Sequence, residues 1–225
     1  MADADPFTDR TEAGRSLAPV VANHLDRLAH HGRPLVLALP RGGVPVGYEV
    51  ARAVDADLDV IAARKIGVPG QPEVGLGAVT EDGPPILDRT LLHHLGLDER
   101  QIQPLIQRER AEVRRRLARY RGDRPHPNLT DQTVVIVDDG LATGVTARAA
   151  LAAARAHRPA HLAFAAPVCA AQSAAGLESE ADAVLCAQTP DRFGAVGRWY
   201  HDFTQVTDTE VERLLATAWT TNAIR

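Results

Sequence analysis

Two adjacent carboxylates stand between an apolar run and a loop of small residues. The run 134–137 (VVIV) precedes Asp138 and Asp139, and the loop 140–146 (GLATGVT) follows them. The β-branched run predicts a strand that is buried on both faces, and the Ala-rich segment after the loop predicts a helix. A loop that opens a helix binds phosphate through its free backbone N–H groups. Because the two carboxylates would repel that phosphate, we expect them to face a hydroxyl-rich part of the same ligand, such as a ribose diol.

A simpler alternative is a strand that ends in solvent, with one aspartate capping the next helix. It accounts for one carboxylate and leaves the second, and the Thr-Gly-Val-Thr sequence, without a role. We therefore favour the ligand site. The residues expected around the phosphate are Ala142, Thr143, Gly144, Val145 and Thr146.

A second loop is suited to a pyrophosphate group. Residues 35–39 (LVLAL) predict a buried strand, residues 40–43 (PRGG) a tight loop, and residues 46–54 a helix. Arg41 supplies a planar charge for phosphate oxygens, and Gly42 and Gly43 let the backbone N–H groups approach. On its own this segment would be better interpreted as a surface turn. Its pairing with the acidic motif favours a binding site.

A third cationic site is predicted after the next strand, residues 58–61. Arg64 and Lys65 would end this strand at the edge where open α/β sheets bind ligands, and would neutralise a leaving pyrophosphate. The alternative is an ordinary solvated strand end. Residues 67–73 (GVPGQPE) predict a mobile loop.

Together these segments resemble the binding signature for phosphoribosyl pyrophosphate (PRPP) in type I phosphoribosyltransferases. A closer likeness, over nearly the whole chain, is to bacterial phosphoribosyltransferase-domain proteins that carry Leu-Pro-Arg-Gly-Gly, Arg-Lys-Ile-Gly, Asp-Asp-Gly-Leu-Ala-Thr-Gly and Trp-Tyr-x-Asp-Phe segments. The resemblance implies an α/β fold in which helices flank a mostly parallel sheet. It implies one domain, residues 1–225, with a core at 35–186 and variable hood elements within 67–130 and 187–225.

The resemblance also implies a reaction: transfer of 5-phosphoribosyl from PRPP to a nitrogenous base, with release of pyrophosphate. Asp138, Asp139, Arg41 and Lys65 would be the catalytic residues. Mg²⁺ would be the cofactor, held mainly by PRPP and water. In this family the pyrophosphate loop often carries a cis peptide, here expected at the bond entering Arg41, and a lid closes at a position similar to 67–73.

The acceptor is not fixed by the sequence. Hypoxanthine-guanine enzymes usually have Asp where this chain has Ala142, whereas adenine and uracil enzymes commonly have Ala. This weakens a 6-oxopurine assignment. Trp199 and Tyr200, in an aromatic-rich stretch at 193–203, are candidates for stacking on the base, the alternative being that they close the edge of the core.

Composition is typical of a compact enzyme. The 225 residues are 45% hydrophobic with a net charge of −4, which argues against a general nucleic-acid or membrane binder. Seven arginines in a predicted helix at 102–120 and just beyond it alternate with glutamates and indicate a solvated face. We expect Cys169 and Cys186 to be buried thiols, and the protein to be cytoplasmic, without a signal peptide, and a possible homodimer.

Three other functions remain open from the sequence. The first is a regulator on the same fold that binds PRPP or a nucleotide. The second is an interaction module of competence-type DNA uptake, and the third is an enzyme that hydrolyses or phosphorolyses a nucleotide. Measured turnover separates them, because a regulator binds PRPP without releasing pyrophosphate.

Overall fold

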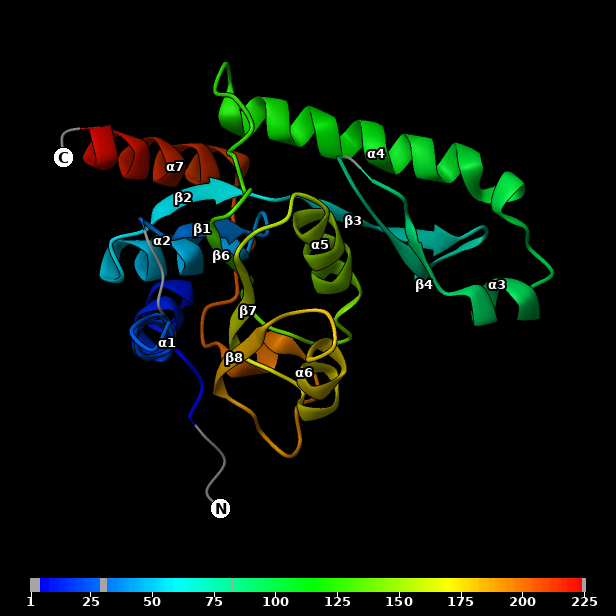
Figure 1. Ribbon diagram of the computed structural model, residues 1–225. Helices are drawn as coiled ribbons and strands as arrows, with labels where there is room; N and C mark the ends of the chain where they lie inside the picture. Colours follow the sequence, from blue (N-terminus) through cyan, green and yellow to red (C-terminus); the bar gives the residue numbers. More distant parts are fainter. Residues whose placement is uncertain (1–4, 29–31, 82, 224–225) are drawn as a thin grey trace.

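A five-stranded parallel sheet forms the centre of the protein (Figure 1). The computed structural model describes residues 5–28, 32–81 and 83–223; for residues 71–73, 222 and 223 it describes the backbone only. The strand order is β2-β1-β6-β7-β8, with all neighbours parallel. These strands are β1 (Leu35–Ala38), β2 (Asp57–Val60), β6 (Thr133–Val137), β7 (His161–Val168) and β8 (Ala183–Gln188).

Helices cover both faces of this sheet, which is why the central strands are apolar without alternation. One face packs against α1 (Arg10–Leu25), α2 (Gly43–Ala53) and α7 (Asp208–Ala223), and the other against α5 (Val145–Ala156) and α6 (Ala171–Leu177). In β6, Val135 and Val137 belong to the first core cluster, and Val134 and Ile136 to the second. The carboxyl ends of β1 and β6 therefore meet at one edge between two helical layers.

An arm extends from the core beside α5 (Figure 1). It consists of an antiparallel sheet, β3 (Ala63–Val68), β4 (Gln71–Thr80) and β5 (Ile86–Leu87), with α3 (Arg89–His94) and α4 (Glu99–Arg121). Its small apolar core includes Ile66, Leu76, Ile102 and Ile106. A capping box at Asp98 and Gln101 fixes the start of α4.

The expected α/β architecture and parallel core are confirmed, and the helices predicted around 17–28, 46–54, 102–120 and 208–216 are present. The loop predicted at 67–73 is wrong, because these residues form the ends of β3 and β4 and the turn between them. The expected lid is thus part of a hairpin. Among the described residues, none of the helices combines the length and apolar character that a membrane crossing requires.

Candidate functional site

The two loops that the sequence singles out lie against each other at the edge of the sheet. A Cβ built on Gly42 would come 2.0 Å from Oδ2 of Asp139, and one on Gly43 would come 2.6 Å from the carbonyl oxygen of Val137. The backbone N–H of Leu39 donates to that same Val137 carbonyl at 2.8 Å. Glycine is therefore required at both positions by close packing. The contact brings the proposed pyrophosphate loop directly onto the acidic pair.

The two carboxyl groups of the pair have different surroundings. Burial, and then the charge of Asp139, raise the pKa of the Asp138 carboxyl well above its usual range. Oδ1 of Asp138 accepts a hydrogen bond from the backbone N–H of Asp139 at 2.9 Å. Asp139 instead accepts from the Arg10 guanidinium at 2.8 Å. Burial thus favours the neutral form of Asp138, whereas a guanidinium lies against Asp139.

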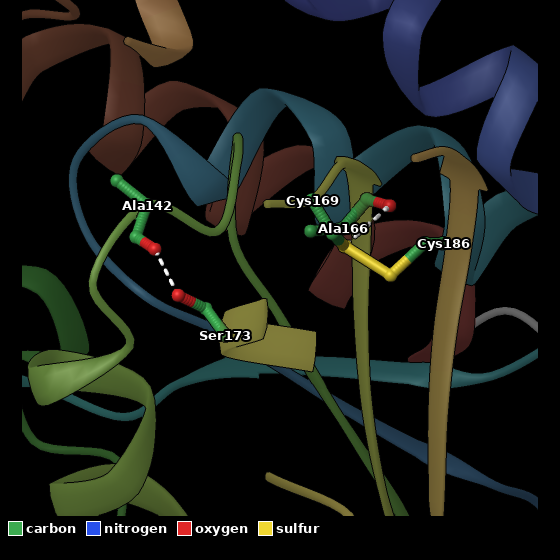
Figure 2. The surroundings of a disulfide bond; sticks show 5 residues. All are labelled: Ala142, Ala166, Cys169, Ser173 and Cys186. Carbon is green, nitrogen blue, oxygen red and sulfur yellow. Dashed lines mark hydrogen bonds between the residues drawn. A yellow bond between two sulfur atoms is a disulfide. The ribbon is translucent and has the colours of Figure 1, made fainter. Parts of the chain in front are cut away.

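The proposed phosphate loop is open to solvent and firmly attached underneath. Ala142 and Thr143 are exposed, and Gly144, with φ of 76°, turns the chain into α5. Leu141 bridges to Cys169 beyond β7: its N–H donates to Val168 and its carbonyl accepts from Ala170. The Ser173 hydroxyl donates to the Ala142 carbonyl (Figure 2). A loop held in this way presents its outer N–H groups in a fixed arrangement.

Arg41 lies in the loop between β1 and α2, and the bond that joins it to Pro40 is cis, as expected. Its side chain is about one quarter exposed and its Nη1 is 3.8 Å from a carboxylate oxygen of Asp208, at the start of α7. Asp208 also accepts hydrogen bonds from Tyr120 at 2.6 Å and Arg119 at 2.8 Å. The Asp208 carboxylate is thus held mainly by α4, and its contact with Arg41 is looser.

Comparison with known proteins agrees with this geometry. The model of the phosphoribosyl transferase domain matches residues 11–204. The chain belongs to this family. Two Mycobacterium tuberculosis proteins, named provisionally as phosphoribosyl transferases, are 42% identical over 93% of the chain. The match covers 46% of their length, so the chain spans about half of these relatives.

Two solved structures are similar to this chain in three dimensions. The crystal structure of TT1426 from Thermus thermophilus has a TM-score of 0.79 and 39% identity, covering 94% of this chain and 98% of that one. A hypothetical protein from Neisseria gonorrhoeae, solved with bound ppGpp, has a TM-score of 0.52 and 11% identity, covering 96% and 98%. The second likeness shows the fold alone.

In this phosphoribosyl transferase domain, Arg64 and Lys65 do not end a strand of the main sheet, as the sequence analysis expected. The central strand β2 stops at Val60, and both residues lie within β3 of the arm. Arg64 donates to Glu109 of α4 at 2.7 Å, and the Lys65 side chain lies across Gly75. The predicted position was wrong because the chain leaves the sheet before reaching them; their predicted roles remain predictions.

Trp199 and Tyr200 lie in the interior. Trp199, at the end of the short 3₁₀ helix η1 (Val196–Trp199), and Tyr200 form a buried cluster with Phe7, Ala13 and Val168. The Tyr200 hydroxyl donates to the backbone carbonyl of Asp139 at 2.6 Å. This arrangement favours closure of the core edge over stacking on a base, which stays a prediction. Tyr200 supports the backbone of the acidic turn through this hydrogen bond.

The cysteine prediction was wrong. Cys169 and Cys186 form a disulfide, with Cα atoms 6.1 Å apart, across the neighbouring strands β7 and β8 (Figure 2). The apolar sequence around each cysteine suggested free thiols. The disulfide instead depends on the register of β7 and β8: Cys186 lies opposite Ala166, and Cys169 follows Ala166 by three residues. The sequence spacing carries no signal for this contact.

Sequence reasoning also missed Arg10, which contacts Asp139 from a position 129 residues away. Nothing in the local pattern around Arg10 marks it, because it is simply the first residue of an amphipathic helix. Only the packing of α1 beside the sheet edge brings it to the acidic pair.

Proposed function

We propose that this chain transfers the 5-phosphoribosyl group of PRPP to a ring nitrogen of a base-like acceptor, releasing pyrophosphate in the presence of Mg²⁺. The observation that carries the proposal is the packing of Gly42 against the Asp139 carboxylate. It brings a loop suited to pyrophosphate and a carboxylate suited to a diol within one ligand's reach, beside an exposed loop suited to the 5-phosphate.

Each part would do separate work in the reaction. The loop from Ala142 to Thr146 would bind the 5-phosphate. Asp138 and Asp139 would hold the ribose hydroxyls, and the charge of Asp139 would favour positive charge on the ring as the C1–O bond breaks. The electrons of that bond leave with pyrophosphate, towards Arg41 and Lys65. A new C1–N bond forms to the acceptor, whose ring proton passes to solvent.

The donor set suits a hard cation that keeps most of its water. Asp138 and Asp139 offer carboxylate oxygens at the site, the ligand type Mg²⁺ prefers, and they would contact it chiefly through water. When bound, Mg²⁺ would neutralise charge on the pyrophosphate. A cytoplasmic location and a homodimer belong to the same proposal; the disulfide removes the support that free thiols would have given to the former.

The test is a screen of purine, pyrimidine and other nitrogen acceptors for pyrophosphate release with PRPP and Mg²⁺. We expect release with at least one acceptor. Binding of PRPP without release from any acceptor would favour the regulator on the same fold.

A paired variant tests the acidic site. Asp138→Asn with Asp139→Asn should fold and lose PRPP binding, measured by calorimetry with Mg²⁺, because the substitutions keep size and remove the acceptor charge. The control is Asp123→Asn with Asp191→Asn, which neutralises two exposed carboxylates elsewhere. Unchanged affinity in the first variant contradicts the assignment of the diol.

A further inference from the structure

Arg10 joins three separate segments at the acidic pair. Its Nε donates to Oδ2 of Asp139 at 2.8 Å, and its Nη1 donates to the carbonyl of Thr204 at 2.8 Å. Its guanidinium carbon lies 4.0 Å from the centre of the Phe203 ring. The side chain is 11% exposed although it is the first residue of α1. The guanidinium is therefore fixed by contacts on several sides.

These contacts restrict the position of the Asp139 carboxylate. A guanidinium presents its donors in a fixed plane, so the carbonyl and the ring that orient Arg10 also orient the carboxylate it binds. The neighbouring Asp138 cannot supply a compensating charge. Arg10 is therefore the cation that balances the pair in this part of the structure.

The backbone of the same turn is held independently of Arg10. The Tyr200 hydroxyl donates to the Asp139 carbonyl, and Val196 packs against Gly140, where a Cβ would come 2.5 Å from its side chain. Loss of Arg10 should consequently leave the turn in place and release only the carboxylate. This separation makes the role of Arg10 testable apart from folding.

We propose that Arg10 is a positioning residue for the ribose site: it holds the Asp139 carboxylate in one orientation, so that the ribose hydroxyls meet a preset acceptor. The proposal rests on the proposed function. It also gives the C-terminal segment 203–204 a part in PRPP binding, since this segment holds Arg10 in turn.

The experiment compares Arg10→Gln, Arg10→Lys and the control Arg15→Gln. Arg15 lies on the same helix and pairs with Glu49 of α2 at 3.2 Å, away from the acidic pair. Calorimetry with PRPP and Mg²⁺ should show about 10-fold weaker binding in Arg10→Gln, the scale typical of groups that orient ligand-binding side chains. Arg10→Lys should be intermediate, because it keeps the charge without the planar donors, and Arg15→Gln should match the wild type.

A measurement of folding distinguishes positioning from a general structural role. The Tyr200 hydroxyl and the Val196 side chain hold the turn without Arg10. The melting temperature of Arg10→Gln should therefore stay close to that of the wild type while its PRPP affinity falls, and Arg10→Lys should recover part of that affinity.

The outcomes separate this inference from the proposed function. Wild-type protein that binds no PRPP would refute the proposed function. If the wild type binds PRPP and Arg10→Gln binds it with equal affinity, the role of Arg10 alone is refuted. Should Arg10→Gln fail to fold, Arg10→Lys decides, and wild-type affinity in that variant would overturn the proposal.

Discussion

Charged residues gather at two places, the edge of the parallel sheet and the arm, and they are arranged differently. In the arm, acidic and basic side chains satisfy one another: Arg64 bonds Glu109 at 2.7 Å, and Arg115 bonds Glu112 at 2.7 Å. At the sheet edge, Arg10 pairs with Asp139 at 2.8 Å, but Arg41 is 3.8 Å from the Asp208 carboxylate, and burial raises the pKa of Asp138. The mutual pairing in the arm indicates a structural network, whereas the looser contact of Arg41 and the raised pKa of Asp138 at the edge are typical of a ligand site.

The comparison predicts that the substitution with the largest effect on the reaction lies at the sheet edge. Arg41→Ala should lower the rate of pyrophosphate release on the order of 100-fold, while PRPP affinity weakens much less, because the leaving group gains charge in the transition state. Single-turnover kinetics and calorimetry measure the two. Arg119→Ala is the control, since it also removes a partner of Asp208. Normal turnover in Arg41→Ala would mean that the pyrophosphate loop is misplaced.

A smaller effect is expected in the arm. Arg64→Met should lower the free energy of unfolding by about 1 kcal/mol, as expected for a partly exposed ion pair, and reduce turnover far less than Arg41→Ala. Urea unfolding and pyrophosphate release measure these. Arg108→Met, which removes a more exposed partner of Glu109, should cost less stability. A large loss of rate with unchanged stability would instead support the sequence-based role of Arg64 at the pyrophosphate.

The smallest effect is a difference in pH dependence. Partial burial lowers the pKa of both the His24 and the His161 imidazole, and for His24 the nearby His161 lowers it further; their Nε2 atoms are 2.9 Å apart. Their contribution to stability is complete above the ordinary pKa of 6.5 and is lost as the pH falls below it, because the unfolded chain then binds more protons. In the arm the pKa of Glu112 is lowered to about 2, chiefly by Arg115, so its contribution is lost only below pH 4.5.

Thermal unfolding of the wild type and of His24→Gln between pH 7.5 and 5 tests this order. The wild type should lose stability in that range, and the variant should lose less. An equally steep loss in His24→Gln would show that the histidine pair is not responsible.

The sheet edge was predictable because its sequence is locally consistent: an unbroken apolar run, two carboxylates and a helix-opening loop specify each other. The helix α4 of the arm was also predicted, but the antiparallel sheet of the arm was not, because Gly75 and Gly77 are typical of loops. In the structure they are strand residues that admit close neighbours: a Cβ would come 2.3 Å from Lys65 at Gly75 and 2.0 Å from the Ile86 carbonyl at Gly77. Arg10 and the disulfide were missed for a related reason, since both depend on pairings between distant segments.

The disulfide has a consequence for the margin of the sheet. β8 is an outermost strand, and outermost strands have neighbours on one side only and are the first to fray. The bond from Cys186 to Cys169 secures this strand at the end where Leu141 of the proposed phosphate loop pairs with Cys169. Leu141 bonds to Val168 and Ala170, on either side of that cysteine. The covalent link thus joins the outermost strand to the segment on which the loop rests, a mechanical continuity between the sheet's border and the residues proposed to bind phosphate.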